Sequence, residues 1–225
     1  MITVHHLENS RSQRVLWTLE ELNVPYEIKF YKRDPVTLLA PPELKAIHPL
    51  GKSPVISDGS RVIAESGLIL DYLVTRYGQG KLRPQNEDDL LRYQYWLHYA
   101  EGSFMTPMIV KLVFKRVETG PMPFFVKPVA KKISQTVNEN WTDREIKVHL
   151  DYLETEIART GWFAGAQFTA ADIMMTYPVQ AAAESGMLFG KPNLEDFLRR
   201  VTARASYKKA IERGGPFSVN PSGHG

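Results

Sequence analysis

The chain has 225 residues, with 28 Lys and Arg against 25 Asp and Glu, and its formal net charge of +3 is too small to indicate a nucleic-acid-binding protein. It contains no cysteine, which excludes disulfides, iron–sulfur clusters and a cysteine nucleophile, so any thiol chemistry must use a thiol that the ligand brings. No uncharged stretch approaches the roughly 18 residues of a membrane span, and "MITVHHL" predicts a strand rather than a signal peptide, so we expect a cytoplasmic protein that does not enter a membrane.

Residues 1 to 78 alternate between strand and helix patterns. "ITVHHL" predicts a strand, "SRSQRVLWTLEELN" predicts a helix that stops near Asn23, and "YEIKFYK" predicts a second strand. An irregular segment with a short helix follows, and Asp58-Gly59 signals a hairpin between two more short strands. "SGLILDYLVTRYG" predicts the last helix. This β-α-β-α-β-β-α order predicts an α/β domain with a mixed sheet, which we assign to residues 1–79.

The rest of the chain has helical patterns. The stretch "GQGKLRPQNE" has the composition of a linker, and from about residue 87 the strand patterns give way to long runs of helical periodicity. Thr169 and Asp172, in "FTAADI", have the spacing of a capping box at the start of one of these helices. We therefore expect an all-helical domain over residues 87–225.

Polar residues at the start of the first helix form the first candidate patch. The stretch "ENSRSQR" places Asn9, Ser10, Arg11 and Ser12 at the mouth of that helix. A helix N-terminus stabilises an anion through its unpaired N–H groups and its dipole, and a Ser or Asn side chain can add a directed hydrogen bond. The alternative is that Ser10 or Ser12 is only the N-cap, which contributes about 1 kcal/mol.

The second candidate patch is "HPLGKSPVI". Pro54 begins a strand, where a proline is tolerated because no ladder donor is needed there. We expect the Ser53–Pro54 bond to be cis, which would turn the N–H and C=O of Val55 toward an extended peptide ligand, and Lys52 could then meet a carboxylate. The alternative is an ordinary strand that begins after a glycine turn.

The third candidate patch is "AESGLIL", where a strand ends and a helix begins. Ser66 is a good N-cap at a helix mouth that attracts an anion, and Glu65 could hold an ammonium group beside it. A ligand with an α-amino acid head would match both charges. The alternative is that Glu65 only interacts favourably with the helix dipole.

Apolar residues of the first long helix could line a ligand pocket. Phe104, Met108 and Leu112 share one helix face, and with Met105 they are residues that suit an adaptable apolar wall, although such a face is more often part of a core. His5 and His6 lie on opposite faces of a strand, so we expect no metal site there.

Taken together and in this order, the three patches resemble the glutathione S-transferase family. The resemblance implies a thioredoxin-like N-terminal domain followed by an all-α C-terminal domain, and it covers nearly the whole chain. "HLENSRSQRVLWTLEELNVPYE" looks most like the bacterial and fungal branch related to the yeast Gtt-type transferases.

The resemblance also implies roles at the first patch. Ser10, four residues before Arg14, matches the thiol-activating serine of the theta and delta classes. Asn9 occupies the place of the beta-class cysteine, so it is the second candidate for the thiol activator, with the backbone N–H groups as the third. Ser12 would then be a helix cap.

At the other patches the resemblance implies contacts with glutathione. Val55 would pair with its cysteinyl backbone, Glu65 and Ser66 would hold its γ-glutamyl group, and Lys52 would lie near its glycyl carboxylate. Asp172 matches a structural capping aspartate.

The function implied is a glutathione transferase that uses glutathione as a co-substrate, needs no cofactor or metal and acts on a small apolar electrophile held between the two domains. Phe104, Met105 and Met108 would contribute to the apolar pocket, and the family pattern implies a homodimer. The alternatives are glutathione-dependent reduction of peroxides or disulfides at the same site, and a non-catalytic docking module with this fold.

Overall fold

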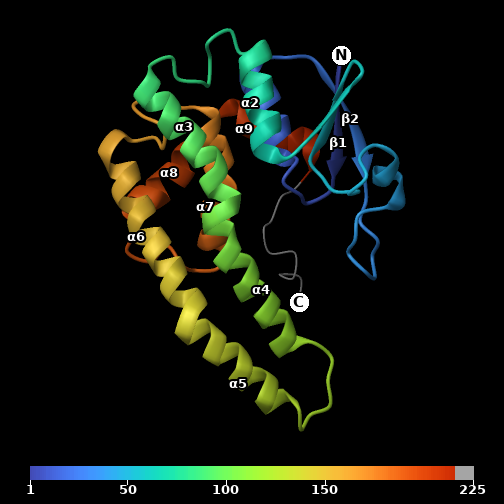
Figure 1. The fold of residues 1–225 in the computed structure, drawn as a ribbon, viewed down its shortest axis with the longest axis vertical. Helices are drawn as coiled ribbons and strands as arrows, with labels where there is room; N and C mark the ends of the chain where they lie inside the picture. Colours follow the sequence, from blue (N-terminus) through green and yellow to red (C-terminus); the bar gives the residue numbers. More distant parts are fainter. Residues whose placement is uncertain (216–225) are drawn as a thin grey trace.

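The computed structural model describes residues 1–215 (Figure 1). Residues 216–225, which include the end of the helical region expected to reach residue 225, lie outside this part. The N-terminal region has the expected order of elements: β1 (Ile2–Leu7), α1 (Gln13–Leu22), β2 (Tyr26–Tyr31), β3 (Val55–Asp58), β4 (Arg61–Ala64) and α2 (Ser66–Tyr77). The short helix expected between β2 and β3 is a single 3-10 turn, Pro42–Ala46.

The four strands form one mixed sheet in the order β2-β1-β3-β4. β1 runs parallel to β2, which the chain reaches by a crossover through α1, and antiparallel to β3, which follows the irregular segment after β2. The hairpin then joins β3 to β4. Side chains of β1 alternate between the two faces. Ile2 and Val4 belong to the main core that the sheet shares with α1 and α2, whereas Leu7 joins a small cluster on the opposite face.

Two local signals in the sequence are confirmed by the backbone. Asn23 ends α1 in the left-handed conformation, with φ 54°. Gly59 lies in the turn of the β3–β4 hairpin with φ 59°, a conformation that glycine adopts without steric penalty. These turns fix where the chain reverses around the sheet.

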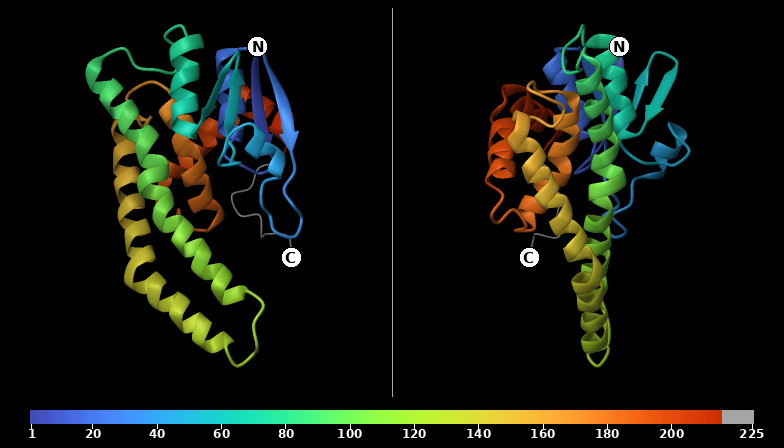
Figure 2. Two further views of the ribbon diagram at one scale, coloured as in Figure 1. Left: turned by 45° about the vertical axis from the view of Figure 1, so that its right-hand side comes forward. Right: turned by 60° about the vertical axis from the view of Figure 1, so that its left-hand side comes forward.

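From residue 87 the described chain is helical, as expected. The two long helical patterns form two long helices, each interrupted by one π-helical segment. The elements are α3 (Glu87–Tyr99), the π segment Ala100–Phe104, α4 (Met105–Thr119), α5 (Lys127–Val137), the π segment Asn138–Thr142, α6 (Asp143–Thr160), α7 (Ala170–Glu184), α8 (Pro192–Ala203) and α9 (Ala205–Gly214). The lower parts of α4 and α5 extend beyond the rest of the molecule as a helical hairpin (Figures 1 and 2).

Helix α7 is the centre of the helical region, and every residue from 170 to 179 is buried. The capping box expected at its start is present. Asp172 accepts hydrogen bonds from the backbone N–H of Phe163 at 2.8 Å and of Thr169 at 2.7 Å, and Thr169 Oγ1 accepts from the N–H of Ala171 at 3.2 Å. This pairing anchors the preceding loop onto the helix.

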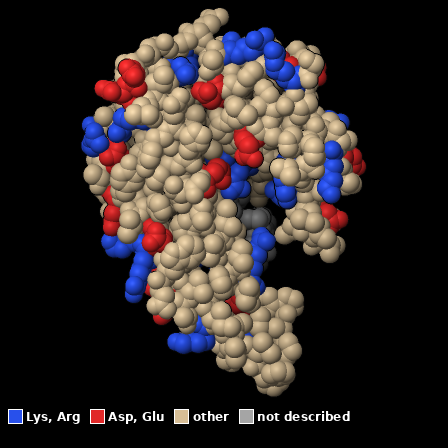
Figure 3. Space-filling model, viewed as in Figure 1, with Lys and Arg blue, Asp and Glu red and all other residues tan. Residues whose placement is uncertain are grey.

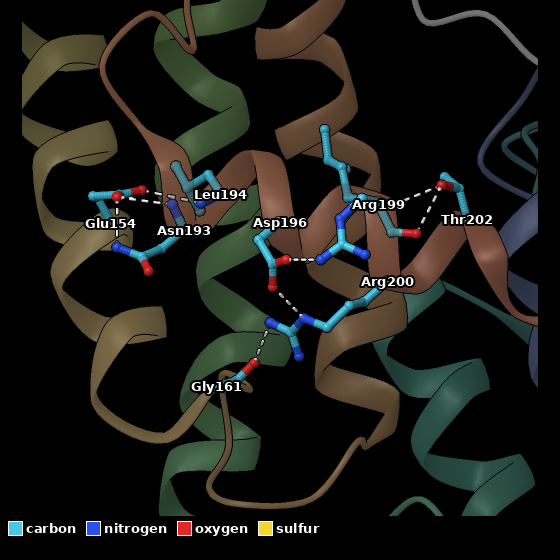
Figure 4. A network of polar contacts seen from close by, with 9 residues as sticks. Glu154, Gly161, Asn193, Leu194, Asp196, Arg199, Arg200 and Thr202 are labelled. Atoms are coloured by element: carbon cyan, nitrogen blue, oxygen red, sulfur yellow. Dashed lines mark hydrogen bonds and ion pairs between the residues drawn. The ribbon is translucent and has the colours of Figure 1, made fainter.

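The backbone N–H groups at the start of helix α8 donate hydrogen bonds to a side chain of a neighbouring helix (Figure 4). No side chain of its own caps it. Instead Glu154 of α6 accepts from the N–H groups of Asn193 at 2.9 Å and Leu194 at 3.0 Å. A carboxylate at a helix N-terminus also interacts favourably with the helix dipole, so one residue both caps α8 and fixes it against α6.

Helix α9 returns to the N-terminal region and packs along α1. Arg204 donates to the carboxylate of Glu21 at 2.5 and 2.8 Å, and Arg213 donates to Glu20 at 2.8 Å. Burial pushes the pKa of Glu20 up, but hydrogen bonds from Lys209, Tyr26 and Arg213 outweigh this effect and hold that pKa below its ordinary value. The last described helix is thereby fixed to the α/β region.

Candidate functional site

The structure brings the three candidate patches together. Ser10 Oγ of the first patch lies 3.4 Å from Ser53 Oγ of the second. Nη2 of Arg14, one turn further along α1, donates to Ser66 Oγ of the third patch at 2.9 Å. The Ser53–Pro54 peptide bond is cis, as expected. Segments separated by more than forty residues in the sequence therefore meet at one place beside the start of α1.

Ser10 is buried and Ser12 does not have the role expected for it. Ser12 occupies the N-cap position of α1, but its backbone is already helical and its side chain caps no backbone N–H. Its hydroxyl instead lies 2.7 Å from Ser10 Oγ and 2.8 Å from Nδ1 of His6 on β1. The interpretation of Ser12 as a helix cap is wrong, because a tertiary contact with the sheet takes the hydroxyl away from the helix end.

The backbone conformation at position 9 explains why an asparagine is found there. Its φ is 47°, in the left-handed region where asparagine is several-fold enriched over most residues. Its carbonyl accepts from Nη2 of Arg33 at 3.3 Å. Half-buried Asn9 therefore shapes the turn that delivers Ser10 to the site.

Val55 and Lys52 lie on either side of the cis bond. Val55 is the first residue of β3, is buried, and pairs with His5 on one side and Ala64 on the other. Lys52 is exposed. The patch therefore combines a fixed strand end with a cation that can move toward a ligand.

Glu65 and Ser66 begin α2 differently from the expected cap. Ser66 is the first helical residue, so Glu65 is the N-cap, and no side chain caps this helix end. Glu65 is exposed with φ 71°, an uncommon conformation for a residue with a side chain. Ser66 is buried and its oxygen accepts from Arg14, which leaves its hydrogen to be donated.

The sequence analysis did not identify the charged cluster beneath these patches. Glu101 Oε1 accepts from Nε of Arg11 at 2.9 Å and from Nη2 of Arg14 at 2.6 Å. Burial raises the pKa of Glu101, but the two arginines outweigh burial and lower that pKa below its ordinary value. Both guanidinium groups also lie over the ring of Tyr177, at 4.6 and 5.0 Å. The cluster joins α1 to the helical region.

One signal in the sequence pointed to this cluster. Arg11 and Arg14 are three residues apart in a helix start that contains no acidic residue in its first turn, so their partner had to come from elsewhere. Glu101 itself carried no recognisable signal. It lies in the π segment between α3 and α4, and such segments are frequent at functional sites because they change the direction of side chains.

A cavity of about 590 Å³ lies between α4 and the end of α7. Met105 and Met108 contribute to its apolar wall with Ile109, Leu112 and Met187, and the basic side chains of Lys111, Lys115 and Arg116 also line it. Phe104 does not line it. Phe104 is fully buried and its ring lies 5.7 Å from that of His149. The structure therefore places Phe104 in the core and not in the wall of this cavity, so its part in the electrophile pocket stays a prediction.

The face that contains these elements is visibly hollowed. Figure 3 shows a depression between the helical region and the strand region, with both basic and acidic side chains around it. Within residues 1–215, no group of three or more His, Asp or Glu residues is arranged to hold a metal ion. In the same part of the chain, no helix is both long enough and apolar enough to cross a bilayer.

Comparison with known families and proteins identifies relatives along nearly the whole chain. The family described as "Glutathione S-transferase, N-terminal domain" matches residues 10–76, and "Glutathione S-transferase, C-terminal domain" matches residues 121–205. Glutathione S-transferase 3 of Schizosaccharomyces pombe is 38% identical over 217 residues, covering 95% of this chain and 88% of that protein. Glutathione S-transferase 1 of Saccharomyces cerevisiae is 33% identical over 230 residues, covering 98% of each.

Solved structures show the same likeness. A glutathione S-transferase from Actinobacillus pleuropneumoniae matches with a TM-score of 0.79 at 32% identity, over 95% of this chain and 93% of that one. A glutathione transferase homologue from Sulfitobacter, solved with bound glutathione, matches with a TM-score of 0.75 over 95% and 98% of the two chains. At 20% identity this second match shows a shared fold alone.

Proposed function

This chain belongs to the glutathione S-transferase family, and we propose that it ionises the thiol of bound glutathione for attack on an apolar electrophile. The observation that carries the proposal is the convergence of the three patches through the Ser10–Ser53 and Arg14–Ser66 contacts, at 3.4 and 2.9 Å. A docking module would not need these polar groups gathered at one helix mouth. The two yeast relatives also support the bacterial and fungal branch that the first helix resembles.

The geometry supports one orientation of glutathione. Its γ-glutamyl head would bind at the start of α2, where Glu65 meets the ammonium group and Ser66 donates to the carboxylate. The cysteinyl backbone would run along Val55, and exposed Lys52 would approach the glycyl carboxylate. This places the thiol at the mouth of α1 beside Ser10. The bound homologue from Sulfitobacter supports a glutathione site in this fold.

The energetic requirement for the thiol is moderate. A free thiol has a pKa of about 8.5, and lowering that pKa by about two units requires roughly 2.7 kcal/mol. A hydrogen bond from Ser10 to the thiolate would supply about 1.5–3 kcal/mol, and the dipole of α1 about 0.3–2 kcal/mol. We propose Ser10 as the donor, with Asn9 second, because the left-handed turn already accounts for Asn9.

The electrophile would bind in the cavity lined by Met105 and Met108. Flexible, polarisable methionine side chains fit a range of apolar shapes. We propose residues 1–79 as the glutathione-binding domain and residues from 87 onward as the source of this apolar pocket. Met105, which lines the pocket, follows Glu101 by about one turn of helix.

Purified protein tests the proposal directly. We expect calorimetry to detect glutathione binding, and we expect conjugation of glutathione to an aryl halide. Binding without conjugation, but with reduction of peroxides or mixed disulfides, would assign the site to glutathione-dependent reduction instead. No binding at millimolar glutathione would contradict the proposal and favour a docking module.

A further inference from the structure

A chain of three polar side chains leads from the thiol position into the protein interior. Ser10 Oγ lies 2.7 Å from Ser12 Oγ, which lies 2.8 Å from Nδ1 of His6. The other ring nitrogen of His6, Nε2, lies 2.9 Å from the backbone carbonyl of Gly214 at the end of α9. Ser10, Ser12 and His6 are all buried, so the path is shielded from solvent between Ser10 and the ring.

The carbonyl at one end fixes the direction of every hydrogen bond in this chain. A carbonyl oxygen can only accept, so Nε2 of His6 carries a hydrogen and Nδ1 of the neutral ring is an acceptor. At 2.8 Å, Nδ1 is a closer acceptor for the single hydrogen of Ser12 than the carbonyl of Leu7 at 3.5 Å, so Ser12 donates to Nδ1 and its oxygen accepts the hydrogen of Ser10. Ser10 Oγ also accepts from the backbone N–H of Ser12 at 3.3 Å. In this state Ser10 directs its hydrogen inward, so it presents its remaining lone pair, rather than a donor, to the thiol position.

This direction is the wrong one for stabilising a thiolate and the right one for removing a proton. We propose that His6, acting through Ser12 and Ser10, takes up the proton of the glutathione thiol. The thiol transfers its proton to Ser10 Oγ, Ser10 transfers its own hydrogen to Ser12, and Ser12 transfers its hydrogen to Nδ1. One S–H bond breaks and one N–H bond forms, and the products are a thiolate and an imidazolium.

The transfer also reverses the direction of the hydrogen bonds that join His6, Ser12 and Ser10. When Nδ1 carries a hydrogen it donates to Ser12, Ser12 donates to Ser10, and Ser10 now directs its hydrogen outward to the thiolate. The same hydroxyl thus accepts the proton first and stabilises the anion afterwards. After the sulfur has formed its new bond, the proton returns along the chain to solvent or to the departing group. This inference rests on the proposed function.

The surroundings of His6 keep the ring neutral until a thiol arrives. Burial lowers the pKa of His6, while the Gly214 carbonyl raises it by stabilising the hydrogen on the ring. The aromatic ring of Phe30 on β2 meets it edge-on at 5.5 Å.

Charged groups on the neighbouring elements are engaged with other partners. Arg11, just before α1, and Arg14 on α1 bind Glu101, Arg213 on α9 binds Glu20, and Lys29 on β2 lies over the ring of Tyr31. On β3, Asp58 accepts hydrogen bonds from two tyrosines of α2. None of these charged side chains contacts His6, so a nearby thiolate is the counter-charge proposed for an imidazolium at position 6.

His5 provides a matched control on the same strand. Its ring points to the other face of the sheet, where Nδ1 lies 3.0 Å from the hydroxyl of Tyr31 and Nε2 lies 2.9 Å from Ser57 Oγ. It is buried like His6 and sits one residue away, but its ring belongs to a different network. A change at His5 therefore tests strand stability without interrupting the proposed path.

Nitrogen NMR of the histidine rings in the full chain tests the transfer itself. Glutathione should shift the Nδ1 signal of His6 to that of a protonated ring at a pH where ultraviolet absorbance shows a bound thiolate. S-methylglutathione, which has no thiol proton, should leave His6 neutral. An ionised thiol together with a neutral His6 would overturn the inference while leaving the proposed function intact. If calorimetry finds no glutathione binding, the proposed function fails and this inference fails with it.

Variants provide a second readout. His6→Asn keeps an acceptor near Ser12 but cannot be protonated, so the pKa of the bound thiol should rise by about one unit, a tenfold change in ionisation constant. Ser12→Ala should act in the same way, and His5→Asn should leave that pKa unchanged. Affinity for S-methylglutathione, which has no thiol to ionise, should stay within about twofold in all three when measured by calorimetry. Equal thiol pKa values in folded His6→Asn and in the wild type would contradict the transfer, and if neither variant folds the NMR experiment decides.

Discussion

Nη2 of Arg14 lies 2.6 Å from Oε1 of Glu101, so a guanidinium of α1 is held by a carboxylate of the helical region. The side chain of Arg14 is 4% exposed, whereas that of Glu101 is 32% exposed. The pair is therefore buried at its cationic end and partly hydrated at its anionic end. Because Arg14 also donates to Ser66, this contact links the two regions of the chain at the proposed glutathione site.

Replacing this carboxylate should destabilise the protein. Glu101→Gln leaves the buried Arg14 charge without its counter-charge, and the free energy of unfolding should fall by about 1–3 kcal/mol, less than for a fully buried pair because Glu101 is partly hydrated. Urea unfolding measures this loss. Lys147→Gln, which removes an exposed pair with Asp151, should change stability by less than about 0.5 kcal/mol. Equal losses in the two variants would contradict a special role for the Arg14 pair.

The thiol activator can be identified by titration. Ser10→Ala should raise the pKa of the bound thiol by about one to two units, because the thiolate loses a charge-assisted hydrogen bond of roughly 1.5–3 kcal/mol. Asn9→Gly is the matched variant, because glycine keeps the φ of 47° without strain and removes only the amide. It should move that pKa less. Ultraviolet absorbance of the bound thiolate against pH measures both, and a shift only in Asn9→Gly would assign the role to Asn9.

The start of α2 should govern affinity rather than chemistry. Ser66→Ala should raise KM for glutathione and leave kcat nearly unchanged, because the γ-glutamyl head is bound equally in the ground and transition states. Glu65→Gln should do the same by weakening the contact with the ammonium group. Steady-state kinetics separates the two parameters. A large drop in kcat at unchanged KM would show that this patch contacts the reacting atoms.

The contacts between α1 and α9 should make stability depend on pH in the acid range. Burial raises the pKa of Glu21, but hydrogen bonds from Arg204 and Ser206 outweigh it and leave that pKa, like that of Glu20, below the ordinary value of 4.5. The unfolded chain then binds more protons, so this stabilisation is complete above pH 4.5 and is lost as the pH falls through the lowered folded values.

Unfolding in urea at a series of pH values measures this effect. Glu20→Gln should flatten the loss of stability below pH 4.5, because the group that takes up the proton is absent. Glu27→Gln, at an exposed position of β2, should leave the slope unchanged. A wild-type stability that stays constant down to the acid range would contradict the assignment.

We expect the protein to be a symmetric homodimer. Large apolar side chains are exposed on α2, α3 and α6, including Leu68, Leu91, Tyr95, Val148 and Tyr152. A twofold axis would let one such surface cover its copy, and this symmetry is the commonest among soluble oligomers. Light scattering should give about twice the mass of one chain, and Leu91→Glu should shift that mass toward the monomer. A wild-type mass near 25.6 kDa would overturn the expectation.

Local signals predicted the elements that local physics determines. The spacing of apolar residues predicted α1, Asn23 its end, Asp58-Gly59 the hairpin, and Thr169 with Asp172 the capping box. Each of these depends on residues a few positions apart. The expectation that the patches belong to one site came from the family resemblance that their order carries.

The features that were missed depend on contacts between distant residues. His6 meets Gly214 across 208 positions, and Arg14 meets Glu101 across 87. Ser12 looked like a cap because nothing near it in the sequence shows that β1 places an imidazole beside its hydroxyl. The spacing of Phe104 in the sequence resembles that of a pocket residue, but the structure buries its side chain in the core at the end of a π segment.

The carbonyl of Gly214 has a consequence for how this protein becomes active during its synthesis. The α/β region emerges first from the ribosome and can begin to fold, but the acceptor that sets the tautomer of His6 is made more than two hundred residues later. A Cβ at Gly214 would lie 2.4 Å from Oε1 of Gln13 and 2.5 Å from Cδ1 of Leu16, so both side chains would have to shift to admit one. A nascent or prematurely terminated chain that lacks α9 therefore carries the proposed thiol-binding residues with an unfixed imidazole, and the last described helix supplies the hydrogen-bond acceptor that the first strand's histidine needs.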